Sequence, residues 1–322
     1  MSMTVGVTGG AGFIGCKLVR RLLDRGYSVR VLDDFRASAE GNLSGLEVDL
    51  IEGDIRREES VAPFVEGLDF LYDLAAIAHI GECERKPEES FLINAYGRHV
   101  VLRELERRPI RGYLFPSSVF GIYGTPEYSP VDEQHPVSPR NLYGVAKRAS
   151  ELMIMSHHRK VGTPVVVVRQ SNVYGPSPGI KYDSVTHIFI EQCLQGRPLT
   201  IHGGDEVRNF IYIDDLLDAY LAVLDRGVGG GEIINLAGFE TSIRGLADLV
   251  ESEVRRYQTG GSHDETASAA REPVGARLVS TEKARETLGF EPQVDLQEGV
   301  RRTVQYIAAS APDSAITSRG AE

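Results

Sequence analysis

The stretch VTGGAGFIG, residues 7–15, joins the end of an apolar segment to the start of an amphipathic one. Its glycines Gly9, Gly12 and Gly15 have the spacing G-x-x-G-x-x-G. Between a strand and a helix, one such glycine permits a tight turn, one lets backbone N–H groups approach a pyrophosphate, and one lets the helix pack closely on the sheet. The N-terminus of the helix also favours an anion. We therefore predict that Gly9, Gly12, Phe13, Ile14 and Gly15 form the binding loop for a dinucleotide.

Around the glycine loop an apolar run is followed by an amphipathic stretch, and this alternation continues along the first half of the chain. Strands are predicted at Val5–Thr8, Ser28–Asp33, Val48–Ile51, Phe70–Ala75, Tyr113–Pro116 and Val165–Arg169. Helical spacing is found at Ile14–Arg25, Glu58–Val65, Glu88–Arg107 and Leu142–Lys160. This alternation is typical of an α/β protein and predicts a Rossmann-type, doubly wound parallel sheet in residues 1–170.

The pattern changes after Ser171, where loops rich in glycine and proline begin. We predict a smaller C-terminal substrate-binding lobe in residues 171–308, with some segments returning to the first lobe. In this part of the chain, helices are predicted at Val185–Gln195 and Asp214–Leu224 and a short strand at Leu199–His202. Residues 258–270 are expected to be a loop, and residues 309–322 a disordered tail.

Composition limits the classes of partner and compartment. The formal net charge of −11 argues against nucleic acid, which requires a basic surface. No apolar run approaches the roughly 20 residues that span a bilayer, so no membrane association is expected. Three widely separated cysteines favour a reducing compartment over a disulfide framework, and the start MSMTVGVTGG lacks a signal peptide. A cytoplasmic protein is predicted, and no metal site is expected.

An aspartate ends the second predicted strand, about 20 residues after the glycine loop, as in dinucleotide-binding units. Asp33 can accept hydrogen bonds from both hydroxyls of an adenosine ribose, and it would repel a 2′-phosphate. Its position therefore favours NAD over NADP as the cofactor. In the segment EGDIR, Asp54 is a candidate acceptor for the adenine amino group and Ile55 a candidate cover for the ring.

The segment NLYGVAKRASE places a tyrosine and a lysine four residues apart, and so on one face of a helix. Tyrosine alone is a poor base at neutral pH, but a neighbouring ammonium favours the phenolate and lowers its pKa. Tyr143 and Lys147 are therefore the predicted acid/base pair. We also expect Lys147 to hold the nicotinamide ribose.

With these motifs assembled, the chain resembles the extended short-chain dehydrogenases/reductases that act on nucleotide sugars, the epimerase/dehydratase branch. The resemblance extends to about residue 305 and includes TGGAGFIG, LAAIAHIGECERKP, PSSVFGIYG, YGVAK, RQSNVYGP, VRNFIYIDDLLDA and STEKARETLGFEP. It implies that bound NAD oxidises the sugar at carbon 4, that a tyrosine takes the hydroxyl proton, and that the same hydride is later returned.

The resemblance also assigns residues and a partner. It implies that Ala75 and Ala76 line the cofactor and that Asn94 supports that site. It implies that the sugar nucleotide is bound by Asn172, Arg208 and Arg277. A homodimer formed through the helices at Glu88–Arg107 and Leu142–Lys160 is implied in the same way.

The segment PSSVFGIYG departs from the family pattern. Family members carry Ser or Thr four residues before the tyrosine of the Y-G pair, whereas this chain has Val119 there. We predict that Ser118, one residue earlier, supplies the hydroxyl as a catalytic and substrate-binding group. The alternative is that no side-chain hydroxyl serves and that water or Tyr143 acts alone.

The next two positions bear on the reaction. The 4,6-dehydratases that resemble this family carry Asp-Glu where this chain has Phe120 and Gly121. Elimination needs an acid and a base, whereas epimerisation needs only the redox step and rotation of the keto sugar. A 4-epimerase of a UDP-hexose or UDP-GlcNAc is therefore favoured. A UDP-N-acetylglucosamine 5,6-dehydratase of antibiotic-type sugar biosynthesis, an NADP-dependent reductase and a non-catalytic NAD-binding regulator remain as alternatives.

Overall fold

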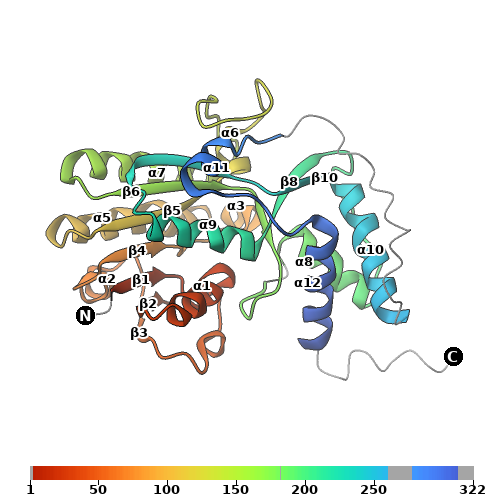
Figure 1. Cartoon of the computed structure of the whole chain (residues 1–322), viewed down its shortest axis with the longest axis horizontal. Helices are drawn as coiled ribbons and strands as arrows, with labels where there is room; N and C mark the ends of the chain where they lie inside the picture. The colour runs from red at the N-terminus through yellow and green to blue at the C-terminus, as the bar shows by residue number, and fades with distance from the viewer. Residues whose placement is uncertain (1–2, 182, 260–277, 311–322) are drawn as a thin grey trace.

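The computed structural model describes residues 3–181, 183–259 and 278–310. Seven strands form one parallel sheet in the order β3-β2-β1-β4-β5-β6-β9 (Figure 1). The sheet confirms the predicted Rossmann-type fold, and six of its strands lie where the sequence predicts strands. Their bounds are β1 Thr4–Thr8, β2 Ser28–Asp33, β3 Asp49–Glu52, β4 Phe70–Asp73, β5 Gly112–Ser118, β6 Val165–Gln170 and β9 Gly230–Leu236.

Helices cover both faces of this sheet because its strands are apolar on both sides. Along β6, Val166 and Val168 pack in one core, while Val165 and Val167 pack in the other. The first core includes residues of α1 Phe13–Asp24, α9 Ile213–Asp225 and α11 Glu282–Leu288. The second core includes residues of α2 Glu58–Val65, α5 Gly97–Arg107 and α7 Leu142–Val161. The sheet is therefore the middle of three layers.

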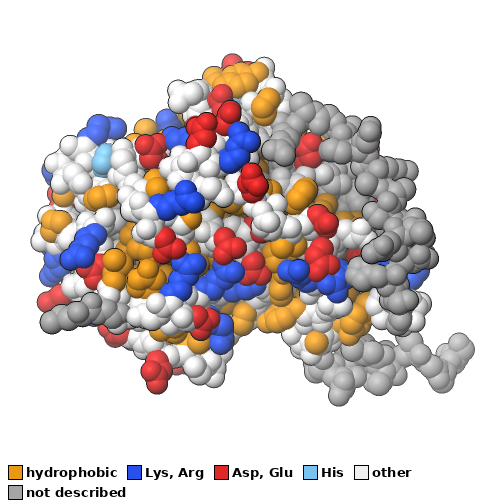
Figure 2. All heavy atoms as spheres, in the orientation of Figure 1, with side chains coloured by type: hydrophobic (Ala, Val, Ile, Leu, Met, Phe, Trp, Pro, Cys, Tyr) orange, Lys and Arg blue, Asp and Glu red, His pale blue; other side chains and the backbone are white. Residues whose placement is uncertain are grey.

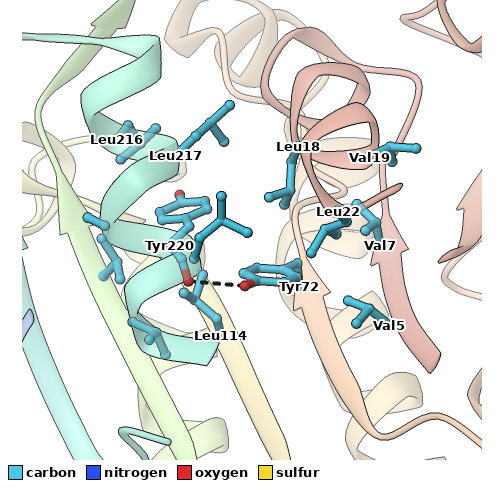
Figure 3. Packing of buried hydrophobic residues seen from close by; sticks show 14 of the residues in the cluster. Val5, Val7, Leu18, Val19, Leu22, Tyr72, Leu114, Leu216, Leu217 and Tyr220 are labelled. Carbon is cyan, nitrogen blue, oxygen red and sulfur yellow. Dashed lines mark hydrogen bonds between the residues drawn. The ribbon is translucent and has the colours of Figure 1, made fainter. Parts of the chain in front are cut away.

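The core beneath α1 and α9 contains a tyrosine that is fully buried (Figure 3). The hydroxyl of Tyr72 on β4 donates to the backbone carbonyl of Tyr220 on α9, at 3.0 Å. Leu18 and Leu22 on α1 pack in the same cluster. The hydrogen bond satisfies a polar group that would otherwise destabilise an apolar core.

Ion pairs join α1 to α9 at the surface of the same layer. Lys17 lies 2.9 Å from Asp214, and Arg25 lies 2.6 Å from Asp225. On the face drawn in Figure 2, acidic and basic side chains are interspersed, so that no broad basic surface forms there. Within the described residues, no helix has the length and the hydropathy needed to cross a bilayer.

A buried ion pair connects the carboxyl end of β4 to its neighbours. Asp73 pairs with Arg98 of α5, and both side chains are almost wholly buried. The Asp73 carboxylate also accepts hydrogen bonds from the Thr8 hydroxyl at 2.5 Å and the Tyr113 hydroxyl at 2.6 Å. Because these donors come from the end of β1 and from near the start of β5, one carboxylate ties β4 to both of its neighbouring strands.

A smaller sheet of three strands, in the order β10-β8-β7, lies beside the large one. Its strands are β7 Asn172–Tyr174, β8 Val207–Tyr212 and β10 Phe239–Ser242. Three helices pack on it, namely α8 Val185–Leu194, α10 Ile243–Thr259 and α12 Leu296–Ser310. The predicted division at residues 170 and 171 stays a prediction, since β9, α9 and α11 lie beyond it and complete the layers of the large sheet.

Some details of the second half differ from the sequence prediction. No strand forms at Leu199–His202, where the prediction was wrong, and the strand of this region is β8. Leu199 and Ile201 lie in a loop instead, and their apolar side chains pack against the core of the smaller lobe. The first two residues of the predicted tail, 309 and 310, are instead the end of α12, and residues 258 and 259 of the predicted loop are the end of α10. The rest of the tail, from 311 onward, and residues 260–270 of the loop lie outside the described residues.

We predict that Gly15→Ala destabilises the protein. A Cβ atom at Gly15 would lie 2.2 Å from the Gly9 carbonyl oxygen and 2.8 Å from the Gly10 Cα, so the turn before α1 would have to open. The free energy of unfolding, measured by urea denaturation, should fall by about 1–3 kcal/mol. The matched control is Gly41→Ala, because a Cβ there meets no atom within 4 Å. Equal stability of the two variants would contradict the close approach.

Candidate active site

A cavity of about 520 Å³ lies at the carboxyl ends of the large sheet's strands and is also lined by residues of the smaller lobe. In the sheet, β2 and β3 lie on one side of β1, and β4 and the later strands lie on the other. The strand order therefore reverses beside β1, and doubly wound sheets bind ligands at such a switch point. Most predicted site residues line this cavity: Gly9, Gly12, Phe13, Ile14, Gly15, Asp33, Ile55, Ala75, Ala76, Ser118, Tyr143, Lys147, Asn172 and Arg208. Arg277 lies outside the described residues.

The glycine loop has the geometry of an anion site. Gly9 adopts φ +66°, a conformation that favours glycine, and its N–H donates to the Leu32 carbonyl at 2.8 Å. Gly12 is the N-cap of α1 and offers no capping side chain. The first N–H groups of α1 therefore remain available to a ligand in the cavity. This arrangement fits the pyrophosphate of NAD.

Asp33 presents a fixed carboxylate at the same end of the cavity. It accepts hydrogen bonds from the backbone N–H groups of Ala11 and Phe35 and from the Ser38 hydroxyl, each at 2.9 Å. A carboxylate held in this way can still accept a hydrogen bond from a ribose hydroxyl. The nearby Arg36 is paired with Asp34 at 2.6 Å, and with Glu89, so its charge is already matched. These contacts fit NAD better than NADP.

Two predicted cofactor residues do not line the cavity. Asp54 is bound by Arg56, whose Nη2 lies 2.5 Å from the carboxylate. Burial raises the pKa of Asp54, but hydrogen bonds from Arg56 outweigh it and the pKa is lowered overall. A contact of Asp54 with adenine therefore stays a prediction.

Asn94 does not line the cavity but holds a loop that does. Its side chain accepts from the Ile77 N–H and donates to the Ile77 carbonyl, both at 2.9 Å, and so fixes the loop after β4. The helix predicted at Glu88–Arg107 is interrupted here by a π-helical turn, Leu92–Tyr96, which carries Asn94. The loop fixed by this amide includes Ala75 and Ala76, which line the cavity.

Tyr143 and Lys147 lie on one face of α7, as predicted. Asn141 caps α7 by accepting from the Gly144 N–H at 2.9 Å, which orients the first turn. The Lys147 Nζ donates to the Pro116 carbonyl at 2.7 Å and lies 5.8 Å from the centroid of the Tyr143 ring. The two side chains therefore share one corner of the cavity.

The predicted effect of the lysine on the tyrosine is not found in the protein alone. Burial raises the pKa of Tyr143, the neighbouring Cys83 adds to the rise, and a hydrogen bond with Ser118 opposes it. Burial, together with the positive charge of Arg98, lowers the pKa of Lys147 to about 7. A lysine that is only partly protonated near neutral pH cannot stabilise the phenolate as a full ammonium would.

Ser118 is brought to Tyr143 by a close contact between two helices. Its side chain caps α6, Val119–Tyr123, by accepting from the Gly121 N–H at 3.1 Å. A Cβ atom at Gly144 would lie 1.9 Å from the Gly121 carbonyl oxygen, so only glycine lets α6 approach α7 this closely. As a result, Ser118 lines the cavity near Tyr143.

Val119, the position of the usual family hydroxyl, has a different environment. It is buried and packs with Tyr123, Val131, Ala237 and Val279, and it is not among the cavity-lining residues. The geometry therefore favours Ser118 over position 119 for contact with a substrate.

The substrate end of the cavity contains residues of both lobes. Arg208 on β8 and Asn172 on β7 line it opposite Phe120 and Gly121 of α6. Four further residues also line the cavity, namely His79, Glu82, Val185 and Thr186.

The sequence analysis did not single out Gln170, which also lines the cavity. It pairs in register with Ser118 on the adjacent strand, and its side-chain oxygen accepts from the buried Tyr220 hydroxyl. The sequence signal for Gln170 was its place at the carboxyl end of a predicted strand. Its partner on α9 is distant in sequence and could be found only in the fold.

The chain is similar to known proteins over nearly its whole length. The model of the NAD dependent epimerase/dehydratase family matches residues 5–237. A putative UDP-glucose 4-epimerase of Methanocaldococcus jannaschii is 31% identical over 305 residues, which cover 94% of this chain and 97% of that protein.

Solved structures show the same similarity in three dimensions. A UDP-glucose 4-epimerase of Thermotoga maritima, solved with UDP-glucose, is 29% identical with a TM-score of 0.85, covering 95% of this chain and 99% of that one. DesIV, a dTDP-glucose 4,6-dehydratase of Streptomyces venezuelae solved with NAD, is 27% identical with a TM-score of 0.83, covering 96% and 98%. Similarity therefore extends to both epimerases and dehydratases, and the residues of the cavity must separate the two.

We predict that Lys147→Met changes the pH dependence of stability. The pKa of Lys147 falls from 10.5 to about 7 on folding, so below pH 7 the folded protein bears the full cost of burying the charge. That cost shrinks as pH rises from 7 and is absent above 10.5. Relative to the wild type, the variant should therefore gain several kcal/mol of unfolding free energy near pH 6, and this gain should disappear towards pH 10.

The measurement is urea denaturation of both proteins at several pH values between 6 and 10. The lost hydrogen bond to Pro116 adds an offset that does not depend on pH, so only the slope is diagnostic. A difference that stays constant over this range would contradict the lowered pKa.

Proposed function

The chain belongs to the NAD-dependent epimerase/dehydratase family, and from that premise we propose that it is a 4-epimerase of a UDP-hexose or UDP-N-acetylhexosamine. It is an NAD-dependent enzyme, since the family is one of NAD-dependent enzymes. One observation carries the choice of epimerase. The hydroxyls of Ser118 and Tyr143 line the cavity together, while Phe120 and Gly121 line it where a 4,6-dehydratase has its acidic pair.

When bound, NAD accepts a hydride from carbon 4 of the sugar and later returns it. Tyr143 takes the proton of the carbon 4 hydroxyl, and Ser118 donates a hydrogen bond to the same oxygen. The keto sugar must rotate so that the hydride would return to the opposite face of carbon 4, and Tyr143 then gives the proton back to the carbon 4 oxygen. Lys147 holds the nicotinamide ribose in this proposal, and its partial protonation near neutral pH lets it respond to charge arriving in the cavity.

The nucleotide half of the substrate is assigned to the smaller lobe. Arg208 lines the cavity and offers several N–H donors to phosphate oxygens. Asn172 lines it beside Arg208, with its amide donating to the Asn209 carbonyl at 3.3 Å. Arg277, which lies outside the described residues, is proposed as a second cation for the nucleotide.

Positions 120 and 121, next to Ser118, support epimerisation over the elimination that 4,6-dehydratases carry out. Loss of water from a keto sugar needs one group to take a carbon-bound proton and another to protonate the leaving hydroxyl. Phe120 has no titratable group and Gly121 has no side chain. An epimerase needs neither, because Tyr143 alone serves both proton transfers.

We also propose that the enzyme is a homodimer. Exposed apolar side chains lie on the helices that the family resemblance implicates, namely Phe91, Tyr96, Val145 and Leu152, of which Leu152 is 53% exposed. A second copy covering them would remove this area from water. Cys16, Cys83 and Cys193 are unpaired, which supports a reducing, cytoplasmic compartment.

Incubating the NAD-loaded protein with UDP-glucose and UDP-N-acetylglucosamine should yield a product of unchanged mass that differs at carbon 4. Mass spectrometry and NMR of the product make this measurement. A product lighter by one water would instead establish a dehydratase, and an NMR spectrum with a double bond between carbons 5 and 6 would assign the 5,6-dehydratase alternative. Absence of turnover across a broad panel of nucleotide sugars would favour a non-catalytic regulator.

Tyr143→Phe should lower kcat by about 10²- to 10⁴-fold, because the acid/base hydroxyl is lost. Bound NAD, measured by its release on denaturation, should be unchanged. Tyr257→Phe, at an exposed position on α10, is the matched control and should retain full turnover. Full turnover by Tyr143→Phe would overturn the mechanism.

Ser118→Ala should lower kcat by about ten- to hundredfold, the range expected when a hydrogen bond to a developing charge is lost. Ser118→Thr keeps a hydroxyl and should retain most of the activity. Adding Val119→Ser to Ser118→Ala should not restore turnover, because position 119 is buried away from the cavity. Restoration by that second change would show that position 119 is the active one.

A further inference from the structure

Phe120 and Arg208 are in direct contact across the cavity. The guanidinium carbon of Arg208 lies 5.5 Å from the centroid of the Phe120 ring, and both residues line the substrate end. A cation over an aromatic face at this distance is attracted by the negative electrostatic potential of the ring. The contact joins α6 of the large lobe to β8 of the smaller lobe.

The position of the Phe120 ring is fixed by the helix that carries it and by an apolar cluster. Its helix α6 is capped by Ser118 and packs against α7 through Gly121 and Gly144. Phe120 itself packs against the apolar cluster that includes Val119. Because α6 is fixed on both sides, the ring is a rigid surface on which a flexible side chain can be ordered.

Among the described residues, Glu206 is the only charged residue that forms an ion pair with Arg208. Its Nη2 donates to the Glu206 carboxylate at 2.7 Å, and its side chain is 38% exposed. A long side chain in such a position loses rotamer entropy when it binds a ligand. Contact with the face of Phe120 engages none of the guanidinium N–H groups, so those that Glu206 does not hold can bind phosphate oxygens.

We propose that Phe120 is a positioning residue that holds the Arg208 guanidinium face-on, so that its N–H edge is directed at the diphosphate of the nucleotide sugar. The inference rests on the proposed function, in which Arg208 is the diphosphate ligand. An acidic side chain at position 120 would instead form an ion pair with Arg208 and compete with the phosphate for it. One aromatic residue thus replaces the acid that a 4,6-dehydratase carries at this position and strengthens the binding of the substrate.

Isothermal titration calorimetry of the NAD-loaded protein with UDP and with uridine tests this proposal. Phe120→Leu should weaken UDP binding by about three- to tenfold, within the range for a cation on an aromatic face. Binding of uridine, which lacks phosphate, should be unchanged. Phe120→Tyr keeps the ring and should bind UDP like the wild type, whereas Phe120→Glu should bind UDP more weakly than Phe120→Leu.

Phe239→Leu, an aromatic position on β10 that does not line the cavity, is the matched control. In turnover assays, Phe120→Leu should raise KM for the nucleotide sugar and leave kcat nearly unchanged. Equal weakening of UDP and uridine would show a general structural role and overturn the proposal, as would unchanged UDP binding.

Arg208→Ala separates this inference from the proposed function. If Arg208→Ala weakens UDP binding and Phe120→Leu does not, the positioning role is wrong while the assignment of Arg208 stands. If Arg208→Ala leaves UDP binding unchanged, the assignment of Arg208 fails, and the role of Phe120 fails with it.

Discussion

The buried ion pair between Asp73 and Arg98 is the interaction on which the catalytic end of the sheet depends. Its carboxylate receives hydroxyl donors from β1 and β5, so it ties β4 to the two strands beside it. Arg98 also donates to the Ala75 carbonyl at 2.5 Å, which ties the cofactor-lining loop to the same pair. Removing either partner would leave an uncompensated buried charge, the costly case for ion pairs in protein interiors.

The same pair influences the chemistry of the cavity. The positive charge of Arg98 adds to burial in lowering the pKa of Lys147. The pKa of Lys147 is therefore about 7 in the protein alone, and the pKa of Tyr143 is raised because this side chain is buried. The pKa values of Tyr143 and Lys147 are thus set less by the contact between these two residues than by the burial and the charges around them. Charge brought into the cavity by a ligand would act strongly on both groups, because burial has removed them from the screening of bulk water.

The contact between α6 and α7 decides what the cavity can do. Gly121 and Gly144 let the two helices touch, and this contact brings Ser118 into the wall beside Tyr143. The same turn presents Phe120 to the cavity and to Arg208 of the other lobe. One short helix and its N-cap therefore carry the hydroxyl that we propose for the redox step and the apolar ring at the position where 4,6-dehydratases have an acid. It also links the sugar end of the cavity to the residues assigned to the nucleotide.

The sequence by itself determined the fold of the first lobe, the glycine loop, Asp33 and the Tyr143 and Lys147 pair. These features follow from local periodicity and from backbone positions that only glycine fits, both of which can be read along the chain. Only the tertiary structure decided that Ser118 faces the cavity while Val119 is buried, that Arg56 binds Asp54, and that Leu199–His202 forms no strand. It also decided the direction of the Tyr143 pKa, against the expectation from the lysine four residues away. The reason is that a local pattern encodes which residues are apolar, whereas burial, charge and contact depend on elements that are distant in sequence.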